Sequence, residues 1–441
     1  MFFVTKTKLS EFRETVYQKV IWRPAAILDL VDALTTAGHV SAPVALSESP
    51  LFRRKFSSVY DALVHGGLSD ELKDLFSDSQ DASWETIGGY EIHAIDATPN
   101  ERRSAETLAD RGVLKAQQKE AVRYGHKYSW LVRLVQSGTS WVAPEDIERI
   151  GTATTDTKVA AQQVKGLAGS NQRPKVITAD SRYRDQHFLG AFADLQNTYA
   201  LVRLQNNQKL SQAPLPKPKG SRGAPRKHGA DFQLTDISRT PDASQEFYLG
   251  QQKVRVRVWH KLHFKRLAKV VGSVVRVEFL KEDGTPRYKR PLWLFWTGPE
   301  NVAPQDLCRM YLWRFAIEHL FRFLKQHLGL NSHRSSNLES LKRWMWIVAL
   351  AYWQLLLMRD IVKPNRPAWH PHKKDGQDKP LTPAQVQRSA QAFLLPSGTP
   401  APNTRPAGKG RGRPKGYHPA PRKRFEVVFK TKKAQKQPKI C

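Results

Sequence analysis

Residues 90–204 alternate strand-like and helix-like segments, and this alternation limits the folds that the chain can adopt. The segments YEIHAIDAT and HKYSWLVRLVQSG have the apolar pattern of strands, and KVITAD and TYALVRL are short apolar strands. Residues 154–168 and 186–196 have helical spacing. Strands that alternate with helices form layers around a central sheet. We therefore expect an α/β fold in this part of the chain.

The net charge indicates a polyanionic partner. The chain has 71 Lys and Arg residues against 40 Asp and Glu residues, which gives a net charge of +31 with His neutral. Cationic side chains bind nucleic acid by displacing the counterions condensed on its phosphates. We expect a nucleic-acid partner, and an anionic membrane surface or simple solubility are the alternatives.

Cysteine usage and hydropathy favour a cytoplasmic protein without a membrane span. Cys308 and Cys441 form neither a metal pair nor a disulfide framework, which favours a reducing compartment. The first residues lack the apolar core of a signal peptide. The longest uncharged apolar run, residues 344–358, is shorter than the ~20 residues that span a bilayer. This run favours a buried core helix over a membrane segment.

The chain divides into five segments of different composition. Helical spacing predicts a helical N-terminal region that either binds DNA or serves only in packing. A Pro-, Gly- and Lys-rich loop followed by three strands predicts an antiparallel β-rich insertion within the core. The expected segments are the N-terminal region (1–86), the first part of the core (87–205), the basic loop and insertion (206–302), the C-terminal helices of the core (303–362) and a basic Pro-rich tail (363–441).

Three carboxylates are candidates for a metal site. Asp96 lies in one strand and Asp180 ends another, where a charge is costly unless a partner or a metal compensates it. Either Asp alone is more often a strand-end or helix-cap residue. With Glu318 from a helical segment, the three could converge at one sheet edge and hold two Mg²⁺ ions, roughly 3.5–4 Å apart. Such a site would cleave and rejoin nucleic-acid strands.

The helical segment 311–325 places four polar side chains on one stripe. At ~100° per residue, these side chains fall within about 60° of one another. They are either a solvated polar face with i,i+4 pairs or a carboxylate flanked by cations that faces a ligand. The stripe consists of Tyr311, Arg314, Glu318 and Lys325. The apolar side consists of Trp313, Ile317, Leu320, Leu324 and Leu328.

The spacing of the stripe, Tyr311-x2-Arg314-x3-Glu318-x6-Lys325, resembles the Y-R-E-K signature of bacterial insertion-sequence DDE transposases. The segments HAIDAT and VITADSRYRD resemble the surroundings of the first and second Asp of that family. The resemblance covers about residues 88–330. It implies an RNase H-like α/β core interrupted by a β-rich insertion, here with a helical N-terminal region and a basic flexible tail.

The resemblance implies a role for each matching residue. The catalytic residues and ligands of two Mg²⁺ ions, for which Mn²⁺ can substitute, would be Asp96, Asp180 and Glu318. The residues that hold DNA phosphates near the transposon end would be Tyr311, Arg314 and Lys325. The protein would act on terminal inverted repeats and target DNA as a homodimer assembled on DNA, associated with the bacterial nucleoid. The alternatives are a metal-dependent nuclease without strand transfer and a non-enzymatic nucleic-acid-binding protein.

Two further features are expected to contact DNA. The resemblance implies that a flipped base stacks on Trp293, although plain packing of Trp293 or the same role for Trp296 are alternatives. Residues 397–441 hold thirteen Lys or Arg residues and one acidic residue, and we expect this segment to be flexible without DNA. Within it, KGRGRPKG resembles an AT-hook that enters an A·T-rich minor groove through Arg411 and Arg413, with diffuse phosphate attraction as the alternative.

Overall fold

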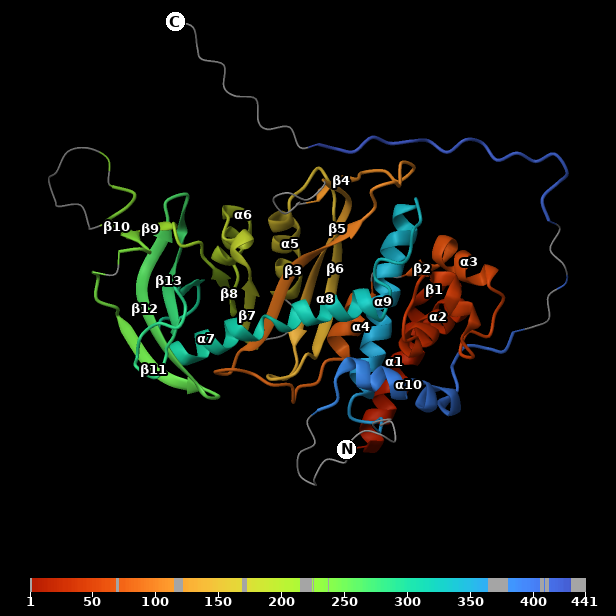
Figure 1. Cartoon of the computed structure of the whole chain (residues 1–441), viewed down its shortest axis with the longest axis horizontal. Helices are drawn as coiled ribbons and strands as arrows, with labels where there is room; N and C mark the ends of the chain where they lie inside the picture. Colours follow the sequence, from red (N-terminus) through yellow and green to blue (C-terminus); the bar gives the residue numbers. More distant parts are fainter. Residues whose placement is uncertain are drawn as a thin grey trace, which may run out of the picture.

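The structure is a computed structural model, and it shows a mixed α/β protein with a large mixed sheet between layers of helices (Figure 1). The α/β class expected from the sequence is confirmed. The described residues are 2–68, 71–114, 122–168, 173–214, 224, 226–236, 238–363, 380–404, 408 and 412–429.

The centre of the sheet contains the strands that were predicted around the two Asp residues. In the order β6-β5-β3-β7-β8, β5 is antiparallel to β6 and β3, whereas β3, β7 and β8 run parallel. A short edge strand, β4, also pairs with β5. The strands are β3 (Glu91–Glu101), β4 (Gly112–Leu114), β5 (Arg123–Leu134), β6 (Val142–Ile150), β7 (Lys175–Ala179) and β8 (Thr198–Arg203).

The predicted insertion extends this sheet. β12, β13 and β14 are antiparallel neighbours as expected, and β14 pairs with β8, so insertion and core share one continuous sheet. The segment expected to be a basic loop also contributes short strands. The strands of this part are β9 (Lys209–Gln212), β10 (Asp231–Gln233), β11 (Ala243–Leu249), β12 (Gln252–Phe264), β13 (Leu267–Phe279) and β14 (Leu292–Trp296).

Helices cover the two faces of the sheet, and each face has its own hydrophobic core. One core contains α5 (Asp156–Ala168) and α6 (Gln186–Gly190), together with side chains such as Ile95 and Ile177 from the central strands. On the other face, α7 and α8 cross the sheet, and α9 stands between the sheet and the N-terminal helices (Figure 1). The helices in this larger core are α1 (Phe2–Lys19), α2 (Pro24–Thr36), α3 (Ser57–His65), α4 (Leu72–Asp78), α7 (Pro304–Trp313), α8 (Ala316–Gln326), α9 (Leu338–Met358) and α10 (Pro383–Ser397).

The N-terminal helices share the larger core with the sheet instead of enclosing a core of their own. Side chains such as Phe12 and Phe76 stack against Trp353 of α9. The long apolar run is thus the buried helix α9, whose residues 344–358 are all buried. None of the helices in the described part of the chain combines the length and apolar character needed to cross a bilayer.

A helix, α10, follows α9 in the described part of the chain. α10 begins with a capping box in which Thr382 and Gln385 exchange hydrogen bonds, and it buries residues such as Val386 and Leu394. It packs against α2 and α9 in the larger core. The expected basic tail, residues 363–441, therefore contains a helix that packs into the folded protein.

Candidate active site

The helical segment predicted over residues 311–325 is two helices joined by a tight turn. α7 ends before Arg314, and α8 begins after Phe315. At the junction the N–H of Arg314 donates to the carbonyl of Tyr311, and the N–H of Ile317 donates to the carbonyl of Arg314, both at 3.1 Å. Such i to i+3 bonds wind the chain more tightly than an α-helix. The expectation of a single continuous helix was therefore wrong at this turn.

The apolar side predicted for this segment is buried, which confirms that these residues form the packed face of the helical segment. All five of its side chains belong to the larger core, and the most exposed has 7% of its surface accessible. Burying this side against the sheet directs the opposite side toward the ends of β3 and β7. The five residues are Trp313, Ile317, Leu320, Leu324 and Leu328.

Arg314, at the junction, contacts two of the predicted catalytic acids. Its Nη2 donates to Glu318 Oε1 at 3.0 Å, and its Nη1 lies 3.8 Å from Asp96 Oδ2. The guanidinium carbon lies 5.7 Å from the centre of the Tyr311 ring. Three residues of the predicted stripe thus meet beside Asp96, which lies in the middle of β3.

Asp96 and Asp180 are neighbours because β3 and β7 are in register. Ile95 pairs with Ala179 in this parallel pair, so the next residue along each strand is one of the two acids. The pKa of Asp96 is raised to about 6, first by burial and then by the negative charge of Asp180. An acid with such a raised pKa has too little positive charge around it, and a divalent cation would supply that charge.

The cations near the acid pair compensate it only in part. The backbone N–H of Arg182 donates to Asp180 Oδ1 at 2.8 Å, but the Arg182 side chain binds Asp156 Oδ2 at the same distance. Burial lowers the pKa of Lys325, and the charge of Asp96 opposes this shift. Lys325 therefore lies within electrostatic reach of the pair.

Glu318 lies beside the acid pair without sharing a site with it. Its carboxylate is bound to Arg314, and 42% of its side chain is exposed. Within the described residues, no group of three or more His, Cys, Asp or Glu side chains is close enough to hold a metal ion. The oxygen donors of Asp96 and Asp180 fit a hard divalent cation. The third predicted ligand is held by a guanidinium instead.

Tyr311 lies under the same guanidinium and is almost completely buried. Burial raises the pKa of its phenol, while the positive charges of Arg314 and Arg203 oppose the shift. Tyr311 is therefore a buried, uncharged residue that forms one wall of the site. Arg203, at the end of β8, connects this wall to a neighbouring cavity.

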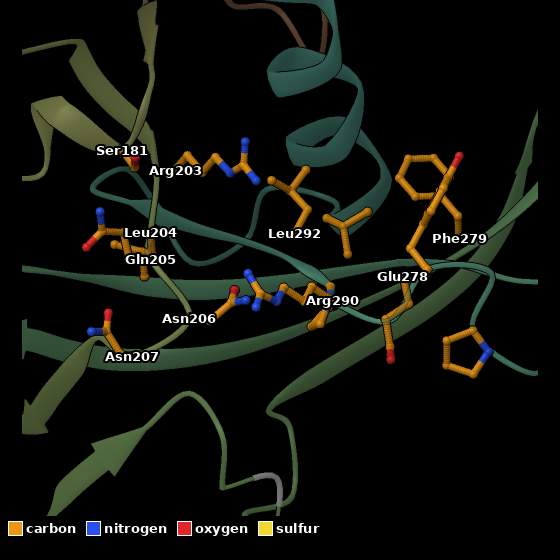
Figure 2. Close-up of a pocket in the computed structure, with 14 residues that line it drawn as sticks. Ser181, Arg203, Leu204, Gln205, Asn206, Asn207, Glu278, Phe279, Arg290 and Leu292 are labelled. Carbon is orange, nitrogen blue, oxygen red and sulfur yellow. The ribbon is translucent and has the colours of Figure 1, made fainter. Parts of the chain in front are cut away.

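A polar pocket of about 810 Å³ opens next to Asp180 (Figure 2). Ser181, the residue after Asp180, lines it together with Arg203 and with Arg290 from the loop before β14. Figure 2 shows the Arg290 side chain extending toward Asn206. Sequence reasoning missed these residues. The available signal was a charged residue that ends β8 and, after Leu204, a run of amide side chains, Gln205, Asn206 and Asn207.

The structure contradicts the expected aromatic platform. Trp293 is only 3% exposed and packs against the Trp259 ring at 5.7 Å, with the Arg276 guanidinium over its other side at 5.4 Å. The rival Trp296 is 1% exposed and donates its ring N–H to the carbonyl of Pro299. Trp293 lies in the core on one face of the sheet and Trp296 in the core on the other, so neither ring is accessible to a flipped base in this structure.

The two arginines expected in a minor-groove arm are described only in part. Arg413 is exposed, and its guanidinium lies 5.9 Å from the centre of the Tyr417 ring. Arg411 lies outside the described residues. Minor-groove binding stays a prediction for both.

A family comparison adds an independent identification. A sequence model described as the transposase DDE domain matches residues 89–354, which include the acid pair, the insertion and the junction between α7 and α8. A comparison with curated proteins found no match. The match covers more than half of the chain and all three predicted acids. This protein belongs to the transposase DDE domain family.

Proposed function

We propose that Asp96, Asp180 and Glu318 are the catalytic carboxylates of this transposase, and that it cleaves and joins DNA strands at the ends of an insertion sequence. The observation that carries the proposal is the in-register placement of Asp96 beside Asp180, with the pKa of Asp96 raised to about 6. Two acids held together with too little positive charge are costly in a purely structural site. A metal-dependent reaction would explain why the protein keeps these two acids together, because the metal ions would neutralise them.

The strand order supports an RNase H-like catalytic core. In the order β6-β5-β3-β7-β8, the first three strands are antiparallel and the last two continue parallel to β3. Asp96 in β3 and Asp180 directly after β7 lie side by side, where the parallel pairing of these two strands ends. The Glu then reaches that edge from a helix that packs across the sheet.

Divalent metal ions, which the family uses in general, would activate the attacking hydroxyl and stabilise the leaving oxygen. Asp96 and Asp180 would hold them, and Glu318 would join on release from Arg314. A DNA phosphate competes well for a guanidinium because it accepts two parallel hydrogen bonds. Binding of DNA would thus move Arg314 from Glu318 to a phosphate.

Lys325 and Tyr311 would support the same DNA contact in different ways. Lys325 supplies a positive charge close to the acid pair. Buried Tyr311 would position Arg314, whose guanidinium lies over its ring. We expect Arg314→Ala and Lys325→Ala each to lower the salt slope of end-DNA binding by about 0.9, the value of one lost phosphate contact. Tyr311→Phe, which removes only a hydroxyl, should cost less.

The proposal is tested with labelled DNA that carries the terminal repeats. The wild-type protein with Mg²⁺ should cut this DNA and join it to a target, whereas Asp96→Asn, Asp180→Asn and Glu318→Gln should bind it without cutting. Cutting without joining would instead support a metal-dependent nuclease. Cutting that persists in any one variant would remove that residue from the catalytic set, and binding without cutting in the wild type would support the non-enzymatic alternative. Assembly as a homodimer on DNA stays a prediction, which light scattering of the complex can test.

A further inference from the structure

A segment near the end of the chain, residues 424–429, is docked against the catalytic layer, and we call it the C-terminal anchor. The N–H of Phe425 donates to the carbonyl of Glu106 at 2.8 Å, and the N–H of Val428 donates to the carbonyl of Arg111 at 2.7 Å. The second bond belongs to an isolated parallel bridge between Val428 and Gly112 of the short edge strand β4, and the first reaches the loop between β3 and β4. An exposed sheet edge accepts an added strand in this way because its N–H and C=O groups are otherwise unpaired.

Side chains hold the C-terminal anchor as well. Arg111 is 3% exposed and donates one Nη to the carbonyl of Phe425 at 3.0 Å and the other to the carbonyl of Arg103 at 2.8 Å. The ring of Phe429 meets the Tyr124 ring edge-on at 6.1 Å. A buried arginine thus joins the C-terminal anchor to the loop that follows β3, the strand that carries Asp96.

The C-terminal anchor lies close to the candidate active site. Val428 and Phe429 line a pocket of about 340 Å³ whose other side includes Asp156. Asp156 binds the Arg182 guanidinium at 2.8 Å, and the Arg182 backbone N–H binds Asp180 at 2.8 Å. One pocket and one ion pair therefore separate the anchor from the acid pair.

The chain is also held on the N-terminal side of this segment. Directly after α10, the carbonyl of Gly398 accepts from Arg13 at 2.9 Å and the carbonyl of Ala401 accepts from Arg53 at 3.2 Å. Figure 1 shows the later described residues, 412–429, passing along the edge of the molecule toward β4. Residues 412–423 are exposed and contain no acidic residue. Their basic residues are Arg413, Lys415, Arg422 and Lys423.

We propose that the C-terminal anchor makes residues 412–423 a fixed DNA-binding arm, which contacts the backbone of the duplex that enters the active site. The inference rests on the proposed function, because DNA must reach Asp96 and Asp180 for the arm to meet it. A held arm has less freedom to lose on binding than a free tail of equal charge. It also presents its cations at high effective concentration and at a defined place on the DNA.

The test breaks the anchor without changing the charge of the arm. Val428→Pro removes the N–H that bonds to Arg111, and Val427→Pro is the matched control, since the N–H of Val427 donates to no described residue. We expect Val428→Pro to speed hydrogen exchange in residues 424–429 and to weaken binding of a terminal-repeat duplex roughly threefold to tenfold. The control should stay within about twofold of the wild type. A thermal melt checks that both variants remain folded.

A cleavage map shows whether the arm has a fixed position. An iron chelate is attached at Tyr417→Cys in a Cys441→Ser background, where buried Cys308 is protected from labelling. With the anchor intact, the chelate should cut the DNA at a few adjacent positions, and in Val428→Pro the cuts should spread. Equal affinity and an unchanged map would overturn the inference. Tighter binding by Val428→Pro would also overturn it, because the anchor would then shield the DNA-binding face.

The same experiment separates the arm from the chemistry. The map is measured in an Asp96→Asn background, in which the protein is expected to bind DNA without cutting it. The position of the arm on the DNA can then be read without cleavage by the active site. If the Asp96→Asn protein without the chelate cut the DNA, this would contradict the proposed function. The proposal of a fixed arm would be unaffected. Cuts spread over many positions although the anchor is intact would contradict the proposal of a fixed arm. The proposal for the catalytic residues would be unaffected.

Discussion

The two ends of the parallel pair β3–β7 both carry buried charged residues. Only at one end are the negative and positive charges matched. At the start of β3, Glu91 is 2% exposed and lies 3.3 Å from Arg133 Nη2. His93, two residues later, lies 2.8 Å from Glu145 Oε2. Burial lowers the pKa of His93, but Glu145 and Glu91 together raise it more, so the net shift is upward. Each buried acid at this end therefore has a buried positive partner.

The other end of the same strands has an excess of negative charge. Asp96 lies beside Asp180, and the Arg314 guanidinium, 3.8 Å from Asp96, is shared with Glu318. The pKa of Asp96 is raised to about 6 as a result of burial and of this neighbour. The comparison teaches that buried charge alone does not mark a functional site. An imbalance of buried charge, which a ligand can correct, is the better sign.

The largest expected effect distinguishes the two ends of the parallel pair by their role in catalysis. Asp96→Asn and Asp180→Asn should each lower strand cleavage roughly 1,000-fold or more, which corresponds to about 4 kcal/mol in the barrier. Their thermal stability should be equal to or higher than that of the wild type, because the substitution removes repulsion. A large loss of stability in either variant would show that this end is structural, like the other.

The second prediction concerns the balanced end. Glu91→Gln should lower the free energy of unfolding by about 3 kcal/mol or more, because it removes the strongest attractive charge on the buried Arg133 and the buried Lys175 and leaves mainly Glu145 to offset them. Urea denaturation measures this effect. The control is Glu246→Gln, whose exposed pairs with Lys253 and Arg255 should matter little. Equal stability of the two variants would remove the distinction between the ends of the sheet.

The third prediction separates the ends by pH. The pKa of Asp96 is about 6 in the folded protein and 3.8 ordinarily, so between these values the folded state keeps a proton that the unfolded state has lost. Without divalent metal, the free energy of unfolding should fall by roughly 2–3 kcal/mol as the pH rises from about 4 to about 6. Asp96→Asn should remove this slope.

His93 provides the contrast in the same titration. Because its pKa is raised, its contribution to stability should be present at low pH and be lost as the pH rises above its ordinary value of 6.5. Replacing His93 with Gln should flatten the curve in that higher window and leave the lower one unchanged. A curve for Asp96→Asn that matches the wild type from pH 4 to 6 would contradict the acid pair.

The smallest expected effect is stabilisation by metal. A divalent cation at about ten times its Kd should raise the free energy of unfolding by roughly 1.4 kcal/mol, because it binds only the folded state. The rise should disappear in Asp96→Asn and Asp180→Asn and persist in Glu91→Gln. Equal stabilisation of all three variants by Mg²⁺ would place the metal elsewhere.

Much of the central architecture could be predicted from local patterns. The strands that carry Asp96 and Asp180 and the buried side of the helix at residues 311–325 follow from periodicity, which reports the face that a segment buries. The family also follows from the residues around those acids. The role of each acid stays a prediction, because contact with metal and DNA is not a property of a local sequence pattern.

The strand β6, which pairs only with β5 among the described strands, was missed for a physical reason. β6 contains three acidic residues, so its sequence has no strand-like apolar alternation. Its acids are compensated from other parts of the chain, since Gln80 binds Glu145 at 2.6 Å and Lys73 binds both Asp146 and Glu148. A local pattern cannot indicate burial that depends on partners more than sixty residues away.

By itself the sequence determined that the chain is an α/β protein with two strand-borne acids, a polar stripe on a helix and a strong positive charge. Only the tertiary structure decided that Arg314 holds Glu318 apart from the acid pair, that Trp293 is buried and that the C-terminal anchor joins β4. Periodicity is a property of neighbouring residues, whereas pairing, burial of a given ring and strand addition depend on which distant segments meet. Those meetings are set by the packing of the whole sheet and its helices.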